Sequence, residues 1–506
     1  MKLVERLAGN TFYLFANWLS VTVLSFVFWI VVWKSLPPEA AGIISTSVNM
    51  IILISTFGML GFNATLTKLI SEYSKKKQDG KITALIGFSN KLLVTVNVIT
   101  SVAFFSLVYY FQIDLNMPIE ALAAISVGIV VWPLVHSTTS ILVGLQNMRR
   151  IYTTDFAINI FKLIAAAILV YAGFGFMGPL AAIVMSFGIV VVLRRDALRL
   201  GRAVREKVDR HAVFFKYAAP AFVASVSWAL FTNTPTIILT LFDSLKTTGL
   251  FAAALSITSP LALIPGIISQ AVFPITSGLS GSRNQSAAQA KIIKLVMRYV
   301  FFVSVPIMII YAFYSKALVL VFTQIHYLDA VQMIPIVGLA VLVQSIGQIL
   351  VSSLFAIGKA RWNMAVYLVT AAFFICTSIP MTMLLGADGL IASFVAGVAV
   401  FATASYLALR KNLKFSMPWV SMAKLAVPSL LLFFILQSSF ALGLKALETL
   451  PMLALGLVLY IFILGKLKFY STDDVAILRF AESRLKFLSP QLSALRKFVD
   501  VNRGPG

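Results

Sequence analysis

Apolar residues fall into long blocks along the chain, separated by short polar breaks. A helix needs about 20 consecutive apolar residues to cross the hydrocarbon core of a bilayer, and many of these blocks reach that length. The pattern predicts an all-α polytopic membrane protein with about fourteen transmembrane helices. Their expected positions are 11–33, 41–63, 84–111, 120–144, 152–172, 176–193, 213–242, 248–278, 296–314, 331–355, 363–385, 387–409, 422–440 and 449–465.

The composition agrees with a membrane protein, because 60% of the residues are apolar and only 12% are charged. Soluble proteins are roughly 45–50% apolar and about 25% charged. The single cysteine, Cys376, excludes an internal disulfide framework and a cysteine-based zinc site. The three histidines lie far apart and show no metal-ligand spacing, so we expect neither a metal nor a cofactor.

The net charge of +23 would suggest nucleic-acid binding in a soluble protein. With the N-terminus placed in the cytoplasm, however, nearly every lysine and arginine outside the spans lies on the cytoplasmic side. The opposite loops contain only Lys34, Lys246, Lys316 and Lys445. This distribution follows the positive-inside rule. It predicts cytoplasmic N- and C-termini in the inner (cytoplasmic) membrane, contacts with anionic lipids, and no nucleic-acid partner.

The two halves of the chain contain similar short segments in the same order. SLPPEAAGI at 35–43 matches SLKTTGLF at 244–251 and aligns Gly42 with Gly249, while GPLAA at 178–182 matches GLIAS at 389–393. Parallel repeats of this kind predict two bundles around a central cavity, which rock against each other. The expected divisions are an N-terminal six-helix bundle (1–195), a basic cytoplasmic linker (196–212), a C-terminal six-helix bundle (213–412), helices 13 and 14 (413–466) and a cytoplasmic basic amphipathic tail (467–506).

The tail contains its own helix signals. Ser471-x-x-Asp474 predicts a helix cap, and an apolar stripe that begins at Val475 predicts a helix on the inner membrane surface. A helix that docks on a partner protein is the alternative. We expect a second short helix near Pro490.

A charged residue within a span is costly and therefore indicates function. Lys162 is the strongest candidate, because it shares a helix face with Asp155 and Asn159. We hypothesise that Lys162 binds a lipid phosphate and that Asp155 tunes the Lys162 ammonium group. The alternatives are a buried structural pair or a lysine that snorkels toward the headgroups. Lys91 and Arg298 are weaker candidates. For Lys91 the simpler interpretation is a snorkelling side chain, and for Arg298 it is a positive-inside anchor.

Polar uncharged side chains in the spans are suited to a neutral, hydrogen-bonding sugar. Hydrogen bonds between helices are an equally good explanation for such residues. The candidates are Asn17, Asn233, Thr236 and Gln270.

Several segments resemble the polysaccharide transporter family of oligosaccharide flippases, which belongs to the multidrug/oligosaccharidyl-lipid/polysaccharide exporter superfamily. They are KSLPPEAAGI (34–43), STFGMLGFNATLTKLISEY (55–73), GLQNMRR (144–150), KYAAPAFVAS (216–225), TGLFAAALSI (248–257) and VFPITSGLSG (272–281). The similarity extends from about residue 5 to 465, although Ser35, Pro37 and Ala41 depart from the usual turn. The resemblance implies a flippase for polyprenyl-linked sugars, with glycan-assembly proteins as candidate partners.

Two other functions remain open. A proton- or sodium-coupled multidrug exporter would share the fold, but it usually requires buried carboxylates at midplane. Apart from Glu120 and Asp388, which stand at the first or second position of a predicted span, Asp155 is the only acid within a span, and it lies near the cytoplasmic end. A membrane glycosyltransferase or sugar polymerase would commonly need a large outside loop, which the predicted topology lacks. We therefore expect a transporter and not an enzyme.

Overall fold

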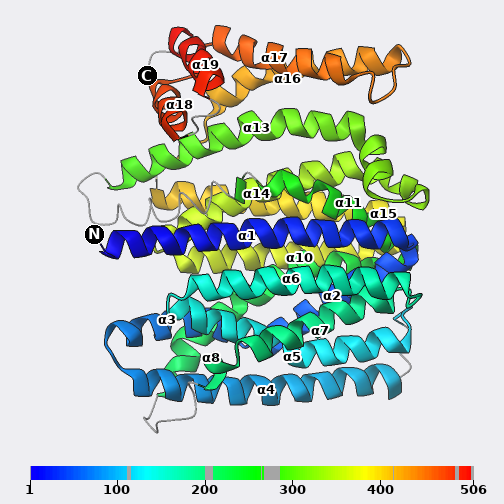
Figure 1. Ribbon diagram of the computed structural model, residues 1–506, viewed down its shortest axis with the longest axis vertical. Coiled ribbons are helices and arrows are strands. Elements are labelled where there is room, and N and C mark those ends of the chain that lie inside the picture. Colours follow the sequence, from blue (N-terminus) through cyan, green and yellow to red (C-terminus); the bar gives the residue numbers. More distant parts are fainter. Residues whose placement is uncertain are drawn as a thin grey trace. The chain divides into compact units, whose positions relative to one another are not determined.

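The computed structural model describes residues 2–110, 115–199, 209–263, 265–266, 285–413, 415–484 and 489–502. Within these ranges the chain is helical and contains no β-strand. Ten of the described helices are long and apolar enough to cross a membrane, and two shorter helices are also apolar. The chain is therefore an all-helical polytopic membrane protein, as the sequence predicts (Figure 1).

The helices follow the predicted spans closely. The first half contains α1 (Lys2–Ser35), α2 (Pro38–Gly58), α3 (Phe62–Lys75), α4 (Asp79–Tyr110), α5 (Ile119–Gly144), α6 (Met148–Tyr171), α7 (Met177–Leu193) and α8 (Arg195–Arg199). The remainder contains α9 (Arg210–Ala212), the π-helix η2 (Val213–Ala218), α10 (Ala219–Phe242), α11 (Leu245–Thr258), α13 (Gln285–Phe322), α14 (Met333–Ala356), α15 (Ala360–Leu413), α16 (Trp419–Ala441), α17 (Leu450–Lys466), α18 (Thr472–Arg484) and α19 (Ser489–Val501).

The long element α15 is two helices that meet at Gly386. This glycine has φ 57° and ψ −135°, a backbone conformation that interrupts the helix and that side chains with a Cβ rarely adopt. The predicted spans 363–385 and 387–409 therefore both exist, one on each side of the glycine. The predicted span 248–278 begins within α11, and its later part lies outside the described residues.

Packing divides the chain into two compact units. One unit contains residues 1–260 and 319–408, and the other contains residues 261–318 and 409–506. The first unit thus includes helices from both predicted six-helix bundles. Compactness and internal repetition are different properties, so the division into two repeated bundles stays a prediction.

Within the first unit, α2 packs against helices from both halves of the sequence. It contacts α5 and α4 from the first half and α10 and α11 from the second half, while α1 lies along α6 (Figure 1). Aromatic rings fill the space between α10 and α15, where Phe231 stacks on Phe394 with ring centroids 5.7 Å apart. Phe374 meets Phe231 edge to face at 5.3 Å. These contacts hold α10 firmly against α15.

The second unit contains the tail, and the predicted cap is present in it. The Ser471 backbone N–H donates to Asp474 Oδ2 at 2.5 Å, at the start of α18. The apolar side of the tail helices packs inside the unit, where Val475 and Val499 share a cluster with Tyr460 of α17. Part of the predicted stripe is therefore covered by protein, and the placement of this tail on a membrane surface stays a prediction.

Asp474 also joins the tail to α13. Arg298 Nη2 donates to Asp474 Oδ1 and Oδ2 at 2.7 and 2.8 Å, and the Tyr299 hydroxyl donates to Oδ1. The Arg298 and Asp474 side chains are 10% and 8% exposed, so the ion pair is almost fully buried. Removal of one partner from a buried pair leaves the other charge without compensation.

We expect Asp474→Ala to destabilise the docked tail by about 3 kcal/mol, because Arg298 stays buried without its counter-ion. Limited proteolysis of the full chain measures the effect as faster cleavage near residue 472. Asp473→Ala is the matched control, since Arg298 donates to the side chain of Asp474 and Asp473 is the neighbouring acid of the same helix. Equal protease resistance of the two variants would contradict the assigned role of Asp474.

Candidate functional site

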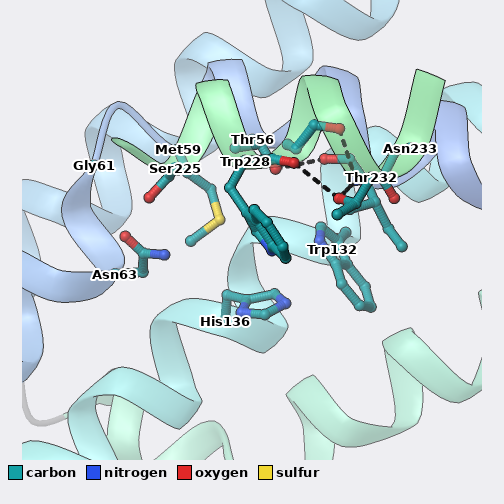
Figure 2. A pocket seen from close by; sticks show the side chains of 12 residues that line it. Thr56, Met59, Gly61, Asn63, Trp132, His136, Ser225, Trp228, Thr232 and Asn233 are labelled. Carbon is teal, nitrogen blue, oxygen red and sulfur yellow. Dashed lines mark hydrogen bonds between the residues drawn. The ribbon is translucent and has the colours of Figure 1, made fainter. Parts of the chain in front are cut away.

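A pocket of about 380 Å³ lies where α2, α3, α5 and α10 meet. It therefore joins helices from the two halves of the sequence within the first compact unit. Figure 2 shows that its side chains come from facing helices and point into a shared space. The lining residues are Ile52, Thr56, Met59, Gly61, Asn63, Trp132, His136, Ser225, Trp228, Ala229, Thr232 and Asn233.

Trp228 of α10 lies at the centre of the pocket (Figure 2). Behind it, its indole packs on Tyr367 and Phe401 of α15, with ring centroids 5.0 and 5.4 Å away. Packing of this kind restricts the rotamers of the indole. The α10–α15 aromatic core thus holds one large, flat side chain in place at the pocket.

α5 contributes the opposite wall. Trp132 and His136 lie one turn apart on this helix and meet edge to face, with ring centroids 4.6 Å apart. Trp132 is also supported from behind by Phe187 of α7, at 4.7 Å. Neither ring nitrogen of His136 has a hydrogen-bond partner in the part of the chain that the structure describes, so the imidazole is available to a ligand.

Polar groups on α10 form a short network at the edge of the pocket. Asn233 Nδ2 donates to the Ala229 carbonyl at 3.0 Å and to Thr232 Oγ1 at 3.1 Å. These bonds fix the amide and leave its oxygen as an acceptor. Asn233 is thus the one predicted site residue, among those that the structure describes, that lines this pocket.

Beyond the pocket, α2 and α10 are joined by a ladder of hydrogen bonds. Asn49 Nδ2 donates to Thr236 Oγ1 at 2.9 Å, and the hydroxyls of Thr46 and Thr240 lie 2.7 Å apart. Thr236 therefore bonds between helices, which is the structural alternative considered for it. The ladder closes the space between α2 and α10 on one side of the pocket.

Gly42 and Gly249, which the predicted repeat aligns, lie at the end of this ladder, where α2 crosses α11. A Cβ added at Gly249 would lie 1.9 Å from the Pro38 carbonyl oxygen, and one at Gly42 would lie 2.1 Å from the Leu245 carbonyl oxygen. Only hydrogen in place of a side chain permits such an approach. The two halves of the sequence thus contact each other at the two glycines that the predicted repeat aligns.

Lys162 does not line the pocket. Its Nζ donates to Asn159 Oδ1 at 2.8 Å and lies 5.2 Å from the centroid of the Phe28 ring of α1. No carboxylate of the described chain lies within ion-pair distance of it. Lys162 and Asn159 are therefore brought together as predicted, and the ammonium group lacks a protein counter-ion there.

Asp155 instead pairs with Arg194, which directly follows α7. Arg194 Nη2 donates to Asp155 Oδ1 at 2.5 Å, and its side chain is 0% exposed. Arg194 also donates to Thr139 Oγ1 at 2.8 Å and to Thr154 Oγ1 at 2.6 Å. Asn17 Nδ2 donates to the other oxygen of Asp155 at 3.2 Å. This cluster ties together α1, α5, α6 and α7.

The other described candidates are not among the lining residues of the pocket. Lys91 is exposed on α4, and Arg298 is bound to Asp474 in the second unit. Gln270 lies outside the described residues. The substrate-binding roles assigned to these residues from the sequence stay predictions.

The sequence did not single out Trp132, His136 or Trp228. Aromatic residues in apolar spans are ordinarily core residues, and nothing in the local pattern separates these from the others. Trp132 and His136 stand one turn apart, which predicts a shared helix face. This spacing was the signal available, but it did not identify the facing helix.

The sequence profile of the polysaccharide biosynthesis protein family matches residues 7–280, which is more than half of the chain. The chain belongs to this family. The resemblance found in the sequence is thereby confirmed, and membership links the membrane fold to polysaccharide synthesis. No curated protein sequence shows a significant match to the chain.

Solved structures share the fold at low sequence identity. The lipid II flippase MurJ, in an inward closed conformation, aligns with a TM-score of 0.69 at 17% identity and covers 89% of this chain and 97% of its own. A multidrug resistance MATE family transporter of the MOP superfamily, in an inward-facing conformation, aligns with a TM-score of 0.64 at 14% identity, covering 78% and 94%. A mutant of the Vibrio cholerae MATE transporter VcmN aligns with a TM-score of 0.56 at 15% identity, covering 82% and 97%.

Proposed function

We propose that the protein is a flippase that moves lipid-linked oligosaccharide across the cytoplasmic membrane by alternating access. The observation that carries this proposal is the pocket of aromatic and uncharged polar side chains where helices of the two halves meet. Family membership supports it, since the family is one of polysaccharide biosynthesis proteins and this member is built to span a membrane. The lipid II flippase among the structural neighbours is consistent with the same activity.

The proposed orientation places both termini in the cytoplasm and the N-terminal ends of α2 and α11 outside. The Gly42–Gly249 contact then closes the outer end, and the pocket near Gly61 and Asn63 lies toward the cytoplasm. Substrate enters from the inside, and separation of α2 from α11 releases it outside. This is alternating access of the kind expected for two rocking halves.

A cation-coupled multidrug exporter is the second candidate, because MATE transporters share the fold. Such an exporter needs a carboxylate that can bind the coupling ion. None of the described lining residues is acidic, and Asp155 is already paired with Arg194. The flippase is therefore the better account of this site, and a transport role is preferred over catalysis of a reaction.

Lys162 is proposed to bind the diphosphate of the lipid carrier, because its ammonium group has no counter-ion in the described chain. We expect Lys162→Ala to insert and fold normally but to lower the translocation rate about tenfold or more, since a charge-assisted hydrogen bond gives about 1.5–3 kcal/mol. Lys75→Ala, which removes an exposed lysine of α3, is the matched control. Normal translocation by Lys162→Ala would remove Lys162 from the substrate path.

Reconstituted vesicles test the flippase proposal. Polyprenyl-diphospho-oligosaccharide is placed in one leaflet, and its arrival in the other leaflet is measured with an impermeant sugar-modifying enzyme. The flippase proposal predicts protein-dependent translocation and no efflux of a cationic dye. Dye efflux driven by a proton or sodium gradient, without movement of the sugar lipid, would favour the exporter instead.

A further inference from the structure

The described pocket lining is aromatic and polar but contains no lysine, arginine, aspartate or glutamate. A diphosphate group is bound by arginine, lysine or clustered backbone N–H groups, which stabilise its charge. The lining offers none of these cationic side chains. The diphosphate of a sugar lipid therefore finds no cationic side chain in the described lining, whereas the neutral sugar finds aromatic and polar side chains.

A sugar ring has an apolar face of C–H groups and a polar edge of hydroxyl groups. Tryptophan complements both parts, since it has a large, rigid apolar surface and an N–H donor. Trp228 and Trp132 approach the pocket from opposite helices, with His136 beside Trp132 (Figure 2). Apolar walls with a few fixed polar groups are typical of small-molecule sites.

The polar groups are suited to hydroxyl recognition. His136 has no hydrogen-bond partner among the described residues, and Asn233 keeps an acceptor oxygen after its two donated bonds. Asn63 and Ser225 add further donors and acceptors on the side of α3 and α10. Neutral donors and acceptors around an aromatic wall recognise a polyol better than an ion.

The aromatic wall formed by Trp228 and Trp132 is preorganised. Tyr367 and Phe401 support Trp228, and Phe187 supports Trp132. Preorganised side chains lose little conformational entropy when a ligand binds. The volume of about 380 Å³ is near the lower end of the roughly 300–1,000 Å³ found for ligand pockets, which suits a short saccharide.

We propose that this pocket binds the neutral sugar head of the substrate, with a pyranose ring stacked on Trp228 and bounded by Trp132 and His136. The diphosphate lies outside the pocket. That the sugar is attached to a lipid carrier rests on the proposed function. That the pocket binds a sugar is argued from its lining residues alone. Trp228 is thus a residue that distinguishes sugar-bearing from sugar-free lipids.

Binding by the full-length protein in lipid nanodiscs tests this proposal. The probes are sugar-free polyprenyl diphosphate and the same lipid carrying glucose, N-acetylglucosamine or a neutral disaccharide. We expect at least one sugar head to tighten binding about five- to tenfold. Trp228→Ala should abolish this gain while the affinity for the sugar-free lipid changes by less than about twofold.

Trp228→Phe should keep most of the gain, because it retains an aromatic face. Trp419→Ala is the matched control, since Trp419 is 61% exposed on α16. If Trp228→Ala does not fold, Trp132→Ala serves as the second variant with the same expected pattern. Equal loss of affinity for sugar-bearing and sugar-free lipids would show a general structural role and overturn the proposal.

Two further results would also overturn the sugar site. One is that no sugar head tightens binding to the wild-type protein. The other is that the pocket prefers tetraphenylphosphonium, a lipophilic cation, and that only this binding depends on Trp228. Sugar-dependent binding without translocation in vesicles would contradict the flippase function and leave the sugar site supported.

Discussion

Replacement of Arg194 with alanine is expected to lower the free energy of unfolding by about 3–5 kcal/mol. Arg194 is fully buried, and it bonds Asp155, Thr139 and Thr154. The variant leaves the half-buried Asp155, whose side chain is 21% exposed, with Asn17 as its remaining side-chain hydrogen-bond partner in the described chain. Loss of Arg194 is costly because the remaining carboxylate is only partly hydrated and has no counter-ion in the cluster.

Arg195→Ala is an unusually close control, since Arg195 is the next residue and is exposed. We expect a change of less than about 0.5 kcal/mol for this variant, as is usual for surface substitutions. Denaturant unfolding in mixed micelles measures both variants. A double-mutant cycle with Asp155→Ala should give a coupling of about 1–3 kcal/mol. Equal stability of Arg194→Ala and Arg195→Ala would contradict the role of the buried cluster.

A methyl group at Gly249 is expected to force α2 and α11 apart. The added Cβ would lie 1.9 Å from the Pro38 carbonyl oxygen, which is backbone and cannot rotate away. Overpacking of this kind costs about 1–3 kcal/mol. The overpacking destabilises only the state in which α2 and α11 are in contact. Gly249→Ala should therefore increase the population of the state in which they are separated about tenfold.

Distances between spin labels measure this opening. Labels attached after Glu39→Cys and Lys246→Cys, in a Cys376→Ser background, report the separation of α2 from α11; both positions are exposed. Gly188→Ala is the control, because a Cβ at Gly188 has nothing within 4 Å. We expect longer distances for Gly249→Ala alone. An unchanged distance distribution would show that this crossing does not separate during the transport cycle.

Most of the membrane fold could be predicted, because membrane insertion depends on the length and hydrophobicity of each local segment. Long apolar blocks became helices, and even the division of α15 fell at the predicted break, Gly386. Gly42 and Gly249, which the predicted repeat aligns, lie in direct contact, although the repeat itself stays a prediction. These features depend on hydrophobic length and on glycine, and both are visible without a structure.

The site was less predictable because it depends on contacts between distant helices. Arg194 directly follows a predicted span and looks like an ordinary cytoplasmic loop charge in the sequence, yet it is buried and pairs with Asp155 across 39 positions. Trp132 and Trp228 resembled ordinary core residues until α5 and α10 were placed together. Thr236 and Asn233 had the same apparent role in the sequence, but one bonds α2 and the other lines the pocket.

The central claim is that the substrate crosses the membrane through the pocket at Trp228, which opens alternately to each side. Thr232→Cys in a Cys376→Ser background places a thiol at this pocket. The account predicts that an impermeant maleimide labels this thiol from either side of vesicles that contain sugar lipid, and that labelling stops translocation. Labelling from one side only, with translocation unaffected by the modification, would contradict it.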